Sequence, residues 1–109
     1  MAFPLQTEAI PLREDESGAL RVGGSRVLLE LVIQAFQDGA TPEAIVQRYE
    51  TLALSDVYAV IAYYLRHRVE VAEYLARRER KADEVQQRAD ARNADLGAIR
   101  ARLLAKRQQ

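Results

Sequence analysis

The chain has 109 residues, no cysteine and one histidine, and its 16 basic side chains balance its 16 acidic ones. That length suits one domain with a modest core and is too short for two, and the residue types exclude disulfides, thiolate metal sites and His-rich metal sites. A net charge of zero disfavours general polyanion binding, and no apolar run approaches the ~20 residues of a membrane span, so we expect a soluble, cytoplasmic protein without a cofactor.

The charge is unevenly distributed along the chain. Residues 1–76 carry six Arg or Lys against eleven Asp or Glu, a net charge of −5, whereas residues 77–109 carry ten against five, a net charge of +5. This shift predicts a small folded domain over 1–76 and a basic helical extension over 77–109. Such an extension favours a negatively charged partner or a groove that accepts a helix.

The stretch AIPLREDESGALRVGG predicts a β-hairpin near the N-terminus. Ile10 and Leu12, then Leu20 and Val22, alternate with polar residues, and the intervening DESG supplies turn chemistry. Gly18 is expected to take the positive-φ position. The strands are short, so the hairpin should be a small feature on a helical body.

The adjacent pair Gly23-Gly24 raises the question of a phosphate-binding loop. A Walker loop needs spaced glycines and a Gly-Lys-Ser/Thr ending, and a dinucleotide fingerprint needs three spaced glycines; neither pattern is present. We therefore interpret Gly23, Gly24 and Arg26 as the turn where the strand leads into a helix. Arg26 lies near a helix N-terminus, where a cation is unfavourable, so we expect it to pair with Glu14 or Asp15.

Three amphipathic helices are predicted between residues 27 and 66. Gly39 suits the C′ position of the first, Thr41 the cap of the second with Pro42 at its first position, and Ser55 the cap of the third. The residues expected to be buried are Leu28, Leu31, Val32, Ala35 and Phe36; then Ala44, Ile45 and Tyr49; then Val57, Val60, Ile61, Tyr64 and Leu65.

A long fourth helix is predicted from Val69 to about Leu96, because no proline or glycine interrupts this range. Apolar residues recur every seven positions, although alanines occupy part of one seam and arginines part of the other. Such a stripe indicates a partner, either a second copy or a different protein. The predicted partner-binding residues are Leu75, Arg78, Val85, Arg92, Leu96, Ile99 and Leu103.

No set of residues indicates catalysis. His67 has no neighbouring nucleophile and is expected at a helix bend, and the serines are explained by turns and caps, so we predict that the chain is not an enzyme and holds no metal. The two short helices over 42–49 and 55–66 suggest a helix-turn-helix, in which Ser55, Asp56 and Tyr58 would face DNA. Because the domain is acidic and the N-terminal half of the second helix lacks cations, such DNA binding would be weak unless the basic extension over 77–109 or a dimer contributes.

Residues 10 to 76 resemble the antitoxin-like family catalogued as domain of unknown function 433. The resemblance rests on Arg21, on Gly24-Ser25-Arg26, on the segment from Gly39 to Ile45, on YETL at 49–52 and on DVYAVIAYYL at 56–65. It implies a winged or homeodomain-like helix-turn-helix fold and an antitoxin role, often opposite a PIN-like ribonuclease toxin.

These observations together predict a mainly α protein: a short N-terminal β-hairpin, a three-helix helix-turn-helix core and a long C-terminal helix. We expect a homodimer that captures a PIN-like toxin and binds its own operator DNA. The alternative is a structural or adaptor homo-oligomer without a toxin partner. An exposed apolar stripe of ~500 Å² favours a dimer over a monomer.

Overall fold

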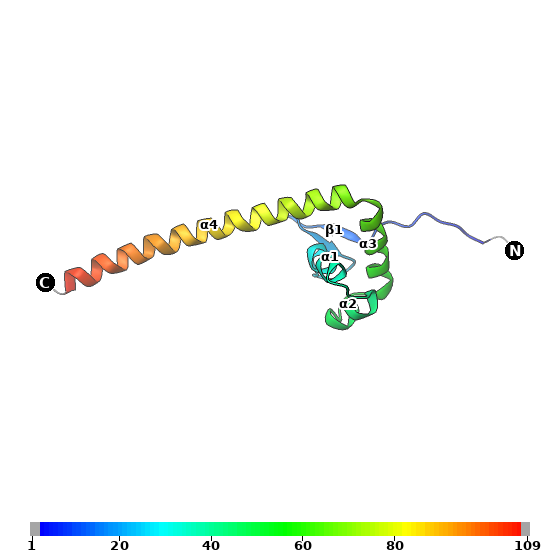
Figure 1. Ribbon diagram of the computed structural model, residues 1–109, viewed down its shortest axis with the longest axis horizontal. Coiled ribbons are helices and arrows are strands. Elements are labelled where there is room, and N and C mark those ends of the chain that lie inside the picture. The colour runs from blue at the N-terminus through cyan, green and yellow to red at the C-terminus, as the bar shows by residue number, and fades with distance from the viewer. Residues whose placement is uncertain (1–2, 108–109) are drawn as a thin grey trace. The chain divides into compact units, whose positions relative to one another are not determined.

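The computed structural model describes residues 3–107 and confirms a mainly helical chain with an N-terminal hairpin (Figure 1). Within these residues there are two strands and four helices. Their bounds are β1 Leu12–Glu14, β2 Leu20–Val22, α1 Leu29–Gln37, α2 Pro42–Arg48, α3 Leu54–Arg66 and α4 Arg68–Arg107. None of these helices is both long and apolar enough to cross a membrane.

The chain divides into two compact units, 1–72 and 73–109, each of which is described here by itself. The division by contact lies four residues before the change in composition at 76/77. The first unit holds the hairpin, α1, α2, α3 and the start of α4. The second unit consists of the rest of α4.

The predicted hairpin is confirmed. β1 and β2 pair antiparallel with Leu12 opposite Val22 and Glu14 opposite Leu20. Gly18 has a φ of 84°, as expected for the turn, because a side chain is disfavoured in that conformation. Ile10 lies before β1 and is 44% exposed, so it does not extend the strand pattern.

Helix α1 ends as predicted, and its buried face includes Val32 and Ala35 as predicted but is rotated away from the rest of the expected stripe. Gly39, with a φ of 96°, donates its N–H to the carbonyl of Phe36, and Ala40 donates to that of Ala35; these two bonds form a Schellman motif. The buried residues of α1 are Leu29, Val32, Ile33 and Ala35. Our assignment of Leu28, Leu31 and Phe36 to the buried face was therefore wrong: Leu28 and Phe36 are half-buried and Leu31 is 42% exposed.

Helix α2 begins as predicted, with the Thr41 hydroxyl accepting the N–H of Ala44 at 3.1 Å and Pro42 at the first position. Of its expected buried face, only Ile45 is buried; Ala44 is exposed and Tyr49 is half-buried.

Helix α3 begins earlier than predicted. Ala53 is the N-cap residue, with no side-chain cap, so the prediction that Ser55 caps this helix was wrong. The physical reason is the burial of two apolar side chains at the start of the helix. Leu52 precedes the cap and Val57 is the fourth helical residue, and both are buried, which are the positions of a hydrophobic staple.

The core of the first unit lies between the hairpin and the first three helices. Its largest fully buried side chains are Val22, Leu29, Val32, Ile33, Ile45, Val57 and Val60. Phe36 of α1 meets Tyr64 of α3 edge-on, with ring centroids 6.1 Å apart, and Gln37 donates to the Tyr64 hydroxyl at 3.1 Å. Leu65, expected in the core, is 45% exposed.

His67 lies at the predicted bend, as the C-cap residue between α3 and α4. Its ring stacks on that of Tyr63 at 4.1 Å between centroids, and Nδ1 lies 3.1 Å from the Tyr63 carbonyl oxygen. Its ring contacts are thus with Tyr63, one turn earlier on α3.

Candidate binding surfaces

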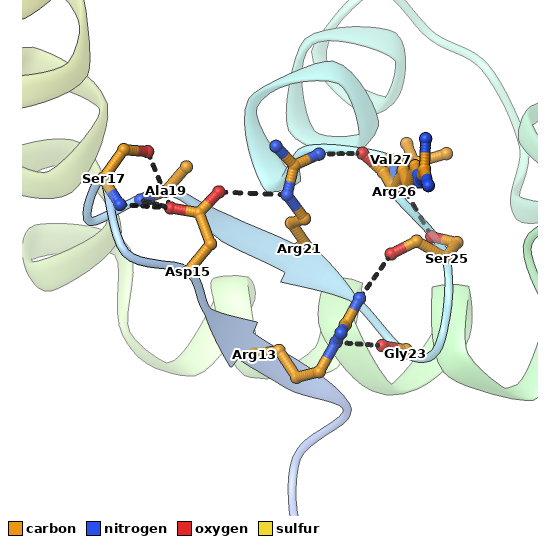
Figure 2. A network of polar contacts seen from close by, with 9 residues as sticks. All are labelled: Arg13, Asp15, Ser17, Ala19, Arg21, Gly23, Ser25, Arg26 and Val27. Atoms are coloured by element: carbon orange, nitrogen blue, oxygen red, sulfur yellow. Dashed lines mark hydrogen bonds and ion pairs between the residues drawn. The ribbon is translucent and has the colours of Figure 1, made fainter.

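The turn at Gly23-Gly24 is held by a polar network that spans the hairpin (Figure 2). The Arg13 guanidinium donates to the carbonyl of Gly23 at 3.1 Å and to that of Ser25 at 2.9 Å. Arg21 pairs with Asp15 at 3.0 Å and also donates to the carbonyl of Arg26. Both guanidiniums therefore cross-link backbone segments.

Asp15 organises the other end of this network. One carboxylate oxygen accepts the hydroxyl of Ser17 at 2.6 Å, the N–H of Ser17 at 2.8 Å and the N–H of Ala19 at 3.0 Å. The Ser17 hydroxyl bond is the largest cause that lowers the pKa of Asp15, followed by the N–H of Ala19. The ion pair expected for Arg26 with Asp15 was wrong, since Asp15 pairs with Arg21.

The hollow beside the hairpin does not offer a phosphate site. It is open, about 700 Å³ in volume, and three arginines in its lining are offset by three carboxylates. Two of those arginines, Arg13 and Arg21, already donate to carbonyls.

Two features of the backbone at position 23 require glycine. Its φ is +57°, and a Cβ built there would collide with Oδ2 of Asp56 and lie 3.2 Å from its Cγ. Gly24 has neither constraint, because its φ is not positive and nothing lies within 4 Å of a built Cβ. Of the two glycines, only Gly23 therefore lies in close approach to α3.

The residues predicted to face DNA lie in the first two turns of α3 and have different surroundings. Ser55 is exposed, whereas the Asp56 carboxylate packs against Gly23. Tyr58 is 49% exposed, but its hydroxyl donates to Oε1 of Glu43 in α2. That bond lowers the pKa of Glu43 and raises the pKa of Tyr58. The carboxylates of Glu43 and Asp56 therefore lie at the surface that was predicted to face DNA.

Helix α4 displays the predicted apolar stripe within the second unit. At ~100° per residue, Val85, Leu96, Ile99 and Leu103 project from one side of an α-helix. Their exposed fractions are 57%, 56%, 50% and 58%. Arg92 is exposed on the same side, while Leu75 and Arg78 are half-buried.

The end of α4 is basic as well as apolar. After Asp95 there is no acidic residue, and Arg100, Arg102, Lys106 and Arg107 follow. Leu104, which the heptad pattern did not include, adds a further apolar side chain that is 53% exposed. Among residues 3–107, no group of three or more His, Asp or Glu side chains is arranged to hold a metal ion.

Residues 16–64 match the model of a family described as "Protein of unknown function (DUF433)". This segment belongs to the DUF433 family. No curated protein matches the chain, and no solved structure matches it either.

The DUF433 segment runs from the hairpin turn to Tyr64 in α3. It therefore includes Arg21, the Gly23 turn and the Glu43–Tyr58 contact, while Asp15, the partner of Arg21, lies one residue before it. The apolar stripe of α4 lies outside it. Sequence reasoning missed the Asp56–Gly23 approach and the Glu43–Tyr58 bond, because neither pairing follows a local spacing rule.

Proposed function

We propose that this chain is a non-enzymatic, cytoplasmic binding protein whose C-terminal helix captures another protein. The observation that carries this proposal is the end of α4, where four exposed apolar side chains share a segment with four cations and no carboxylate. The four apolar side chains are Leu96, Ile99, Leu103 and Leu104.

The chemistry of this segment defines its partner. An amphipathic helix binds by laying its apolar face into a hydrophobic groove. Cations around that face are best matched by acidic side chains along the rim of the groove, which raise the association rate and exclude basic proteins. The family resemblance supplies a candidate, a PIN-like ribonuclease toxin, which would make this chain an antitoxin.

Operator DNA is the second ligand that the resemblance implies. The α2–α3 pair would then act as a helix-turn-helix, with Ser55, Asp56 and Tyr58 nearest the groove. The carboxylates there oppose phosphate, so we expect measurable binding only when a dimer brings two copies and the basic tails to one DNA molecule. The alternative function is a structural or adaptor homo-oligomer, which the same apolar stripe supports.

The first experiment tests capture directly. The full chain is co-expressed with the product of the adjacent gene, and the complex is isolated through a tag on that product. We expect a stable complex that is lost on deletion of residues 77–109.

A pair of matched variants separates the stripe from general effects on the helix. Leu96→Gln with Leu103→Gln removes two apolar side chains from the stripe. Ala94→Gln with Ala101→Gln makes two changes with the same spacing about half a turn away. We expect the first variant to lose the complex and the second to retain it. Equal binding by both variants, or no complex with the full chain, would refute capture through this stripe.

A further inference from the structure

The exposed stripe of α4 has an internal order that constrains what can cover it. Its two seams are Leu75, Ala82, Ala89, Leu96 and Leu103, and Arg78, Val85, Arg92 and Ile99. Large and small side chains therefore alternate in blocks, and arginines interrupt the second seam. We propose that a second copy of this chain covers the stripe, with the two α4 helices antiparallel and Val85 of each opposite Leu96 of the other.

A parallel pair in register is disfavoured by these residues. Each seam residue would face its own counterpart, so Arg92 would meet Arg92 and Arg78 would meet Arg78. Like charges brought together away from water repel strongly. Ala82 and Ala89 would also face alanines and leave gaps, which lose dispersion contacts.

The antiparallel register resolves both problems. With Val85 opposite Leu96, Arg92 lies opposite Ala89, and Ile99 lies opposite Ala82. In these two layers a long side chain meets a short one, which is how facing positions fill space at the density of a protein interior, while Leu103 lies opposite Arg78 at the end of the overlap. The stem of Arg92 can cover the Ala89 methyl group while its guanidinium reaches water at the edge. Two-fold symmetry makes every contact twice.

Charged residues beside the seams select this register among the antiparallel ones. Glu79 would flank Arg100 of the second copy, and Arg88 would flank Asp95, so four attractive pairs form. A shift by seven residues in one direction places Arg88 against Arg88 and loses the Glu79–Arg100 pairs, so only the Lys81–Asp95 pairs remain attractive. A shift in the other direction places Asp95 against Asp95 and Arg88 against Arg102. The remaining unfavourable neighbours, Lys81 and Arg102, lie toward the ends of the overlap.

The paired segment is long enough to matter. Residues 78–103 span about 39 Å at 1.5 Å per residue. The second copy would cover the same apolar residues that we propose for partner capture, so capture would require the two copies to separate. The self-pairing does not depend on that function, because its test uses this chain alone.

The test uses single-cysteine variants, which are clean probes because the chain has no cysteine. Val85→Cys and Leu96→Cys are prepared separately, one of them with a short tag that changes its size. They are oxidised in a glutathione buffer, alone and mixed. We expect the crossed disulfide in the mixture to dominate and each variant alone to remain mostly reduced. Efficient disulfide formation by Val85→Cys alone would overturn the antiparallel register, and no cross-linking at high concentration would overturn self-pairing.

An independent test exchanges two charged residues beside the seams and leaves the seam residues unchanged. The monomer–dimer equilibrium of the full chain is measured by sedimentation equilibrium. Arg88→Asp and Asp95→Arg should each shift the equilibrium toward monomer, and the two together should restore the dimer. In a parallel pair Asp95 would flank Arg100, so the double variant would remain dissociated. A native chain that sediments as a monomer at all concentrations would overturn the proposal.

Discussion

Replacing Gly23 by Ala tests the role of the turn between β2 and α1. The new methyl group would sit on a residue with a φ of +57° and would collide with Oδ2 of Asp56. The backbone cannot easily move away. The Gly23 N–H donates to the carbonyl of Pro11 at 2.7 Å, and its carbonyl accepts the Arg13 guanidinium at 3.1 Å.

The expected cost has two parts. A non-glycine residue in the left-handed region costs about 1–2 kcal/mol. Turning the Asp56 side chain out of the way costs about 0.5–1.5 kcal/mol if it leaves its preferred rotamer. Together they predict a loss of about 1.5–3.5 kcal/mol in the free energy of unfolding, a large share of the stability of a small domain.

The assay is urea unfolding of the full chain, followed by near-ultraviolet circular dichroism of the tyrosines, because α4 would dominate the far-ultraviolet signal. Gly24→Ala is the matched control; nothing lies within 4 Å of its built Cβ, so its effect should stay within about 0.5 kcal/mol. Asp56→Ala should reduce the cost of Gly23→Ala to its backbone part. Equal stabilities for the Gly23 and Gly24 variants would refute the reasoning.

Three further predictions concern the helices of the first unit. Thr41→Ala should lower the free energy of unfolding by about 1 kcal/mol, because the N–H of Ala44 loses its acceptor, while Thr41→Ser should retain most of it; chemical denaturation compares the two. Ile33→Ala should cost about 2–5 kcal/mol and Leu31→Ala much less, since Ile33 is fully buried and Leu31 is 42% exposed; similar losses would contradict the observed face of α1. Tyr58→Phe should return the pKa of Glu43 toward 4.5, measured by NMR titration. Because the folded pKa of Glu43 lies below its unfolded value, this carboxylate stabilises the fold above the unfolded pKa. That contribution is lost as the pH falls through the folded pKa, so the variant should show a smaller loss of stability in acid.

The candidate surfaces could be predicted from the sequence only where the regular spacing of residues along one helix determines which side chains share a face. The stripe with Val85, Leu96, Ile99 and Leu103 follows from helical periodicity in one uninterrupted helix, and the structure places these residues on an exposed face. The ion pair of Asp15 was assigned to the wrong arginine. Arg21 reaches it because the register of the hairpin brings the two side chains to one edge, and sequence distance does not reveal that edge.

The amino-acid sequence by itself determined the hairpin turn, the end of α1 and the start of α2. Gly18, Gly39 and Thr41 act through their own backbone and a neighbour within five residues, so local chemistry suffices to place them. Tertiary packing decided which side of α1 is buried, because α1 is apolar on most of its circumference and offers more than one stripe. Packing also moved the start of α3 to Leu54, where Leu52 and Val57 are both buried, and it brought Asp56 against Gly23. The buried side of α1 and the approach of Asp56 to Gly23 depend on contacts between residues distant in the chain, and such contacts exist only once the hairpin and the helices have assembled.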